Sequence, residues 1–189
     1  MNFRRPSLAA AACVASLLVL IAGCDKDKKG VVPPAELVDL KPTLAVQKLW
    51  DTGVGGGGEK LRLALGLALD RDVLYTAARD GEVIALDPAS GRAKWSQDTK
   101  ADLAAGAGVG ASLVAVGTSD GKVIALDVAS GKVLWQASVS SEVLSAPLVT
   151  GDRVIVRSVD GRVHALDALT GKSQWTGEEP VPKLSLRGT

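Results

Sequence analysis

The sequence has 189 residues, of which 47% are hydrophobic and 23% are charged, and its 22 basic and 21 acidic side chains nearly cancel. This balance excludes the strongly basic surface that proteins use to bind nucleic acid. With only two cysteines and one histidine, the chain also has few residues for a thiol-based or metal-dependent active site.

The chain begins with a segment that has the features of a secretory signal. Arg4 and Arg5 precede an apolar stretch at residues 8–22, which is short for a membrane span. The run Leu-Ile-Ala-Gly-Cys ends at Cys24 and looks like a bacterial lipobox, with small residues ahead of a thiol that receives lipid. We predict a lipoprotein signal peptide at residues 1–23 and lipid on Cys24; the alternative is an ordinary signal peptide. The mature chain then has no free thiol and 20 basic against 21 acidic residues.

Residues 24–43 are predicted to form an extended tether, because a charged stretch is followed by Pro33 and Pro34. Asp25, directly after the cysteine, resembles an inner-membrane retention signal of enteric bacteria, so the choice of membrane stays open. Part of the tether matches EF-hand positions, but Lys29 stands at the fifth position and prolines crowd the loop. We therefore expect no calcium site.

Residues 44–54 contain Trp50 and are predicted to form a lone outer strand. The glycines at 53, 55 and 58 match the spacing of a dinucleotide-binding loop, but no βαβ unit follows them. We interpret this glycine-rich stretch as a flexible link.

A unit of about forty residues then occurs three times without a gap. Its most regular part reads DGEVIALDPASGRAKW from Asp80, DGKVIALDVASGKVLW from Asp120 and DGRVHALDALTGKSQW from Asp160. Asp-Gly between apolar runs predicts a hairpin, and Asp-x-x-Ser/Thr-Gly predicts a second turn. Together with an upstream apolar run, each unit predicts four short antiparallel strands, which make one blade of a β-propeller.

The predicted propeller occupies residues 44–189, in repeats at about 61–100, 101–140 and 141–180, with a further blade beginning at 181–189. The first strands of the three blades are expected at residues 63–69, 103–109 and 145–149, and the second strands at 73–78, 113–118 and 154–159.

The spacing Ala-x-Asp-x-x-x-Gly-x-x-x-Trp holds in all three units. We interpret its tryptophans as structural, since a large ring on an outer strand needs small residues beneath it on a neighbouring blade; the alternative is a cofactor-stacking role. The motif residues are Ala85, Asp87, Gly91, Trp95, Ala125, Asp127, Gly131, Trp135, Ala165, Asp167, Gly171 and Trp175.

His164 replaces the isoleucine of the other two units and is interpreted as a packed residue. No cluster of His, Asp and Glu in the repeats suggests a catalytic constellation. We therefore predict no catalytic residue, no metal and no cofactor.

The motif spacing resembles the tryptophan-docking repeat of quinoprotein-type propellers. Pyrroloquinoline-quinone (PQQ) dehydrogenases share this repeat with the non-enzymatic BamB-type lipoproteins of the outer-membrane assembly machine. The stretch VPKLSLRG from Val181 resembles the BamB-type loop between blades three and four, which contacts the periplasmic POTRA region of the barrel-forming subunit, BamA. The resemblance implies contacts through Leu184, Leu186 and Arg187. The same stretch can also begin the next blade, because Ser185 falls forty residues after Ser145.

This resemblance implies an all-β, PQQ-like propeller, with about three blades present of eight, anchored by lipid at the periplasmic face of the outer membrane. It implies a scaffold of the β-barrel assembly (BAM) complex, without enzymatic activity, whose partners are BamA, other complex members and unfolded outer-membrane proteins. One alternative is a fragment of a quinoprotein dehydrogenase, which would need a calcium-quinone pocket that commonly lies beside a vicinal disulfide. The other is a generic periplasmic adaptor. Because three blades do not close a ring, we expect a partial sequence whose isolated domain is only marginally stable.

Overall fold

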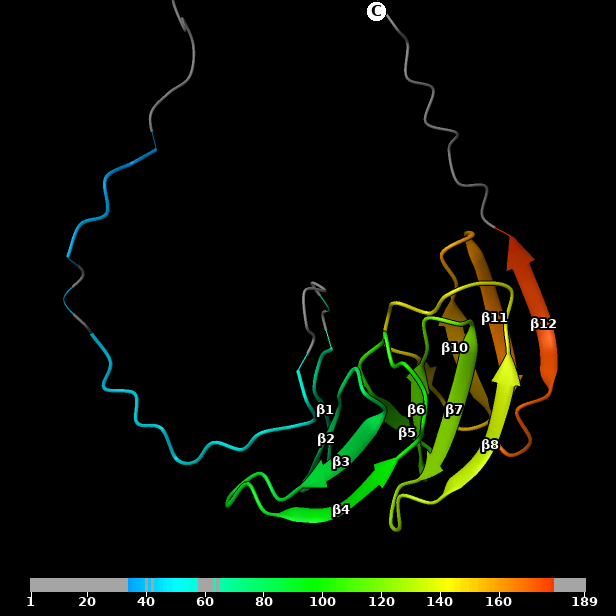
Figure 1. Cartoon of the computed structure of the whole chain (residues 1–189), viewed down its shortest axis with the longest axis horizontal. Coiled ribbons are helices and arrows are strands. Elements are labelled where there is room, and N and C mark those ends of the chain that lie inside the picture. Colours follow the sequence, from blue (N-terminus) through cyan, green and yellow to red (C-terminus); the bar gives the residue numbers. More distant parts are fainter. Residues whose placement is uncertain (1–33, 40, 42, 58–62, 64, 179–189) are drawn as a thin grey trace, which may run out of the picture. The chain divides into compact units, whose positions relative to one another are not determined.

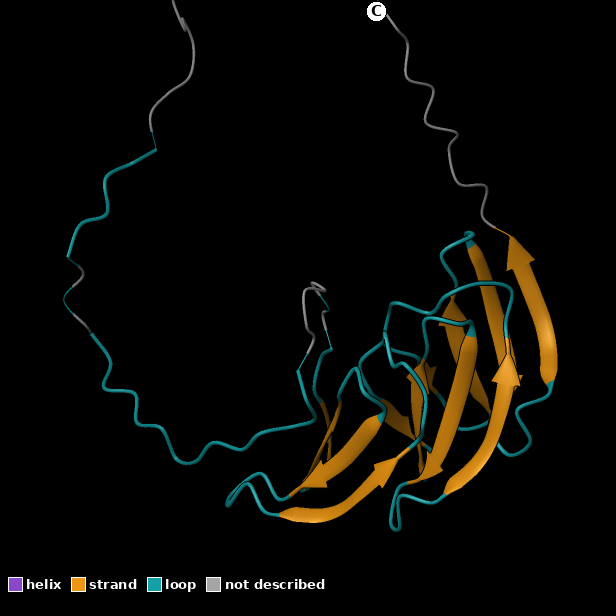
Figure 2. Ribbon diagram, in the orientation of Figure 1, coloured by secondary structure: helices purple, strands orange, loops and turns teal. Residues whose placement is uncertain are grey.

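The computed structural model describes residues 34–39, 41, 43–57, 63 and 65–178. The chain divides into two units, residues 1–45 and residues 46–189. In the second unit the described residues form three four-stranded antiparallel sheets and no helix (Figures 1 and 2). No helix among the described residues has the length and apolar character that crossing a membrane requires.

Each sheet is one blade, and within each blade the strands pair in the order of the chain. Blade one consists of β1 Ala68–Asp70, β2 Val73–Ala77, β3 Glu82–Leu86 and β4 Ala93–Asp98. Blade two consists of β5 Gly108–Gly110, β6 Leu113–Gly117, β7 Lys122–Asp127 and β8 Val133–Ser138. Blade three consists of β9 Leu148–Val149, β10 Arg153–Arg157, β11 Arg162–Asp167 and β12 Ser173–Glu178. The predicted all-β fold of four-stranded blades is confirmed.

The turn between the third and fourth strands of each blade is built by the repeated aspartate. In blade one, Asp87 Oδ1 accepts hydrogen bonds from the backbone N–H and the hydroxyl of Ser90, both at 2.8 Å. These bonds stabilise the carboxylate, with the hydroxyl contributing most, so the pKa of Asp87 lies below its usual range. Asp127 and Asp167 make the same turn in blades two and three, with Ser130 and Thr170.

The first strands are shorter than predicted, spanning three, three and two residues. Neighbouring first strands approach so closely that a Cβ on Gly108 would lie 1.9 Å from the carbonyl oxygen of Pro147. Ahead of β5, Leu103 forms only an isolated bridge with Thr118. Ahead of β5 the apolar residues that predicted a longer strand are buried in an irregular segment, whereas ahead of β1 Leu67 is exposed.

The hydrophobic cores lie between blades, not within a single sheet. One cluster joins blades one and two and includes Tyr75, Val83, Val116 and Ile124. The other joins blades two and three and includes Leu113, Trp135, Val154 and Leu166. Because fully burying a side chain of this size contributes about 1.5–3 kcal/mol, each blade depends on its neighbour for most of its apolar stabilisation.

Candidate functional site

Four of the predicted functional residues lie outside the described part of the chain. These are the lipidation site, Cys24, and the predicted contact residues, Leu184, Leu186 and Arg187. The twelve residues of the docking motif are all described, so the structure shows how they hold neighbouring blades together.

The tryptophan of one blade rests on the motif glycine of the next blade. Trp95 donates its indole N–H to the carbonyl oxygen of Val128 at 3.0 Å, and a Cβ on Gly131 would lie 2.5 Å from the Trp95 ring. Gly131 also has a φ of +72°, which side-chain-bearing residues rarely adopt. The ring therefore lies directly on the glycine backbone, where no other residue leaves room for it.

Trp135 makes the same contact one blade further on. Its indole N–H donates to the carbonyl oxygen of Ala168 at 2.8 Å, and its ring lies on Gly171. The motif alanines have a different place: Ala85 lies opposite Trp95 on the adjacent strand of the same blade and is fully buried. The glycine thus supplies the platform across blades, and the alanine packs beside its own tryptophan. Trp175 is 45% exposed.

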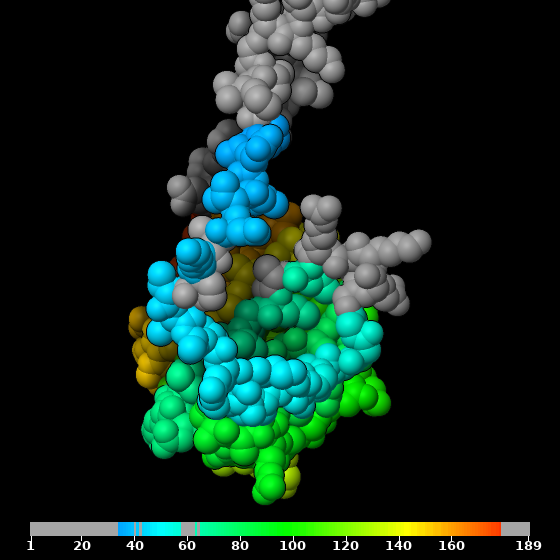
Figure 3. Space-filling model, turned by 90° about the vertical axis from the view of Figure 1, so that its left-hand side faces the viewer, coloured from blue at the N-terminus to red at the C-terminus, as the bar shows by residue number. Residues whose placement is uncertain are grey.

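A strap at residues 50–57 occupies the free platform of blade one. Trp50 donates to the carbonyl oxygen of Pro88 at 2.9 Å and lies on Gly91. Residues 44–54, predicted as a lone outer strand, pair with no described strand, so the strand itself stays a prediction. Trp50 nevertheless fills the position that Trp95 and Trp135 fill in the other contacts. Figure 3 shows the strap in cyan against the green atoms of blade one.

Two carboxylates of blade one hold the other end of the strap. The N–H of Gly55 donates to Glu82 Oε2 at 2.8 Å, and the N–H of Gly56 donates to Asp80 Oδ2 at 2.6 Å. In blades two and three the residues equivalent to Glu82 are basic and form ion pairs with the aspartate of the Asp-Gly turn instead, Lys122 with Asp120 and Arg162 with Asp160. An acidic residue therefore stands at this repeat position only in blade one, the described blade whose carboxylate binds the strap.

His164 is buried in blade three, and its ring nitrogens lie beside three hydroxyl groups, of which that of Ser158 is buried and those of Ser140 and Thr176 belong to exposed residues. Its Nε2 lies 3.0 Å from Ser140 Oγ and 3.1 Å from Ser158 Oγ, and its Nδ1 lies 3.3 Å from Thr176 Oγ1. Burial lowers the pKa of His164 below its usual value. The cluster joins the segment that enters blade three to two strands of that blade, as expected for a packed residue with a structural role.

The rim where the second and third strands of each blade meet differs between blades. At the junction of blades one and two, Arg79 forms an ion pair with Asp102 at 3.2 Å and donates to Ser119 Oγ at 3.1 Å. At the next junction the equivalent residues, forty positions later, are Ser119 and Glu142. The short serine side chain cannot span the distance that the arginine spans.

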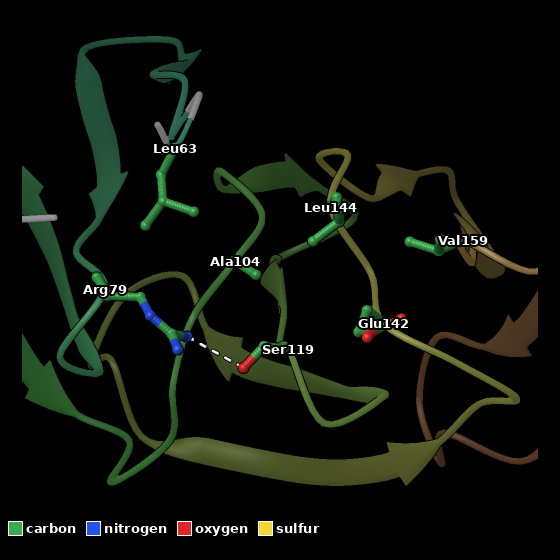
Figure 4. A pocket seen from close by; sticks show the side chains of 7 residues that line it. All are labelled: Leu63, Arg79, Ala104, Ser119, Glu142, Leu144 and Val159. Carbon is green, nitrogen blue, oxygen red and sulfur yellow. Dashed lines mark hydrogen bonds between the residues drawn. The ribbon is translucent and has the colours of Figure 1, made fainter. Parts of the chain in front are cut away.

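A rim pocket of about 360 Å³ opens beside this junction and is lined by the seven residues labelled in Figure 4. Leu144 and Val159, 55% and 50% exposed, line its blade-three side. A second pocket of about 220 Å³ shares both residues and reaches Arg157. The sequence analysis missed this site, although the change from Arg79 to Ser119 and then to Val159 at one repeat position was a visible signal.

The rim pocket has the chemistry of a binding surface. Its walls are mostly aliphatic, and its charged side chains come from Arg79, which is already paired, and from Glu142. Within the described residues, no group of three or more His, Cys, Asp or Glu side chains is placed to hold a metal ion.

The four-stranded blades and the tryptophan-on-glycine contacts define the chain as a β-propeller of the PQQ-like repeat class. A family model described as outer membrane protein assembly factor BamB matches residues 46–105 and 79–189. The chain belongs to this family.

Curated relatives carry the same description. The protein from Pseudomonas aeruginosa is 42% identical over 87 residues, which cover 46% of this chain and 23% of that protein. The protein from Burkholderia pseudomallei is 38% identical over 104 residues, covering 55% of this chain and 26% of that protein. The matched part of the chain thus spans about a quarter of the length of these relatives.

Solved structures show the same fold. The crystal structure of BamB from Moraxella catarrhalis matches with a TM-score of 0.56 and 30% identity over 63% of this chain and 37% of that one. A europium-containing methanol dehydrogenase matches with a TM-score of 0.52 and 26% identity over 59% of this chain and 24% of that one. The blade architecture is therefore common to BamB and to the methanol dehydrogenase, while the family match is to the assembly factors.

Proposed function

We propose that the protein is a non-enzymatic scaffold of the outer-membrane β-barrel assembly complex. The observation that carries this proposal is the family match over residues 46–189, since the curated relatives are named as assembly factors. A scaffold needs a rigid body with an accessible docking surface, and the interlocked blades provide such a body. Its proposed work is to help the folding and insertion of outer-membrane proteins.

The proposed partner is the BamA-type subunit, bound at its POTRA domains through Leu184, Leu186 and Arg187. Leucine side chains provide apolar area that can be desolvated, and arginine adds several hydrogen-bond donors, a combination common in the energetic centre of interfaces. Other members of the complex would bind indirectly or through surfaces elsewhere in the protein. Exposed strand edges would be able to pair with unfolded barrel strands.

Capture of the tagged protein from detergent-solubilised envelopes tests this proposal. We expect the barrel-forming subunit to copurify with the wild type and to be lost with Arg187→Glu. The matched control is Lys183→Glu, which makes the same charge change in the same stretch and should retain the subunit. Copurification of the subunit with both variants would show that the contact does not depend on Arg187. Absence of the subunit from the wild-type preparation would refute the scaffold role.

We further propose that lipid on Cys24 anchors the protein at the periplasmic face of the outer membrane. Metabolic labelling with a clickable palmitate analogue should mark the wild type and leave Cys24→Ser unmarked. Separation of the two membranes by density then gives the location. Labelled protein in the inner-membrane fraction would contradict the outer-membrane assignment and would agree with the retention signal at Asp25.

The quinoprotein dehydrogenases are the competing enzyme class, because they share the blades. Purified protein mixed with pyrroloquinoline quinone and calcium should show no stoichiometric bound chromophore and no alcohol oxidation. A stoichiometric bound chromophore or alcohol oxidation would overturn the proposal that the protein is not an enzyme.

A further inference from the structure

The surface between blades two and three is left open by a gap in a repeated interaction. At the preceding junction, Arg79 crosses from one blade to the next and neutralises Asp102. The segments that enter blades two and three pair with their own blades in the same way: Ser119 N–H donates to the carbonyl oxygen of Asp102, and Val159 N–H donates to that of Glu142, both at 3.0 Å. Across the junctions, Leu103 N–H donates to the carbonyl oxygen of Arg79, whereas Val143 N–H donates to that of Thr118. The two junctions therefore have similar backbones, with a shift of one position in this bond, and different side chains at the position of Arg79.

The junction of blades two and three has Ser119 in place of an arginine, and it exposes both apolar area and charge. Leu144 and Val159 are half exposed at the mouth of the pocket. Glu142 is exposed and accepts a hydrogen bond from the Ser141 hydroxyl at 2.8 Å, but it forms no ion pair with any described residue. An open pocket with aliphatic walls and a carboxylate at its rim that no described cation neutralises favours an apolar side chain that is followed by a basic one.

The sequence repeat predicts that this pocket lies next to the proposed contact stretch. Ala104, Leu144 and Leu184 are separated by steps of forty residues, so Leu184 has the same repeat position on the next junction that Leu144 has on this one. The repeat register therefore predicts that a partner of Leu184 approaches the same rim of the propeller, one blade further along.

We propose that the rim pocket is a second contact site for the polypeptide that binds at Leu184, Leu186 and Arg187, and that it receives an apolar side chain flanked by a basic residue. This inference rests on the proposed function for the identity of the partner, but its residues are different. The pocket volume of about 360 Å³ is within the range of about 300–1,000 Å³ that is typical of binding clefts. The two contacts together would bind the partner across two blade junctions, so that each strengthens the other.

Site-specific photo-crosslinking in the intact envelope tests the proposal. A photoreactive phenylalanine analogue is placed at Leu144, at Val159, at Leu186 and, as a control, at Leu169. Leu169 is 88% exposed, in the turn at the opposite end of β11 from Val159. We expect cross-links to the barrel-forming subunit from the first three positions and none from Leu169.

The outcomes separate this inference from the function on which it rests. A cross-link from Leu186 with none from Leu144 or Val159 would overturn the pocket proposal and leave the scaffold role standing. No cross-link from any position would overturn both. A cross-link from Leu144 or Val159 to a different protein would overturn the stated occupant, and an equal cross-link from Leu169 would show contact without a specific site.

A charge substitution tests the basic group of the partner. Glu142→Lys should weaken binding of the subunit about tenfold, as for the loss of about 1.4 kcal/mol, and should reduce the cross-link from Val159. The neutral variant Glu142→Gln should have a smaller effect. Since Glu142 is exposed, far-UV circular dichroism of both variants should match the wild type. Unchanged binding by Glu142→Lys would refute the charge complementarity.

Discussion

The contact between Trp95 and Gly131 gives the sharpest prediction about stability. Substitution Gly131→Ala would place a Cβ 2.5 Å from the indole ring and would hold alanine at a φ of +72°. The left-handed conformation costs about 1–2 kcal/mol for residues with a side chain. Displacing the ring also breaks its hydrogen bond to Val128, which is worth about 0.5–1.5 kcal/mol. We therefore expect the free energy of unfolding to fall by about 1.5–3.5 kcal/mol.

Urea denaturation of the full-length protein, followed by far-UV circular dichroism, measures this loss. The matched control is Gly151→Ala, because Gly151 lies outside the left-handed region and a Cβ there would contact nothing within 4 Å. That variant should change stability by less than about 0.5 kcal/mol. Equal stabilities of the two variants would refute the claim that the glycine is a platform for the ring.

A double-mutant cycle separates backbone strain from loss of the tryptophan contact. Trp95→Phe alone removes the indole hydrogen bond and should cost about 1 kcal/mol. In the Gly131→Ala background the same change should cost much less, because the ring is already displaced. Full additivity would mean that the two residues do not act together.

Three further predictions concern the strap and two titrating groups. Glu82→Lys should remove the hydrogen-exchange protection of the Gly55 amide and make the strap sensitive to protease, and unchanged protection would show that the carboxylate does not hold it. Burial lowers the pKa of His164, so the unfolding free energy should decrease as the pH falls through 6.5, the ordinary pKa of histidine, and should level off below the native pKa. His164→Gln should abolish this decrease when unfolding is measured from about pH 8 to about pH 5. The Ser158 hydroxyl is the largest cause that lowers the pKa of Asp160 to about 2. The stabilisation from Asp160 is therefore complete above about pH 4 and is lost between about pH 4 and pH 2, and Ser158→Ala should raise that pKa in a carboxyl-carbon NMR titration.

The repeat made most of the fold predictable from sequence. Three aligned copies of Asp-Gly and Asp-x-x-Ser/Thr-Gly located the turns, and the turns located the central strands to within one or two residues. The docking role of the tryptophans also followed from their spacing, because three large rings at one repeat position have one common structural cause. These features are local, so short-range pattern is sufficient to predict them.

The sequence did not reveal how closely neighbouring blades approach or where the pairing within a blade shifts. The first strands of neighbouring blades come close together, as the proximity of Gly108 to Pro147 shows, and no local pattern marks this approach. In each blade the pairing shifts by one residue after the Ala–Trp pair, as between Ala85 and Leu86, and no residue type marks the shift. The rim pocket arises from residues that differ between copies, whereas the analysis of repeats looked for what the copies share.

The direction of the tryptophan contacts has a consequence for how the protein is made. Trp50, Trp95 and Trp135 each rest on a glycine that comes later in the chain than the ring itself. A blade that emerges from a ribosome or a translocation channel therefore has no platform for its tryptophan until much of the following blade has emerged. When blades fold in the order in which they emerge, each new blade covers the indole of the blade before it and presents its own ring to water. Folding in this order is vectorial, and the blade formed last is then the one whose tryptophan is uncovered.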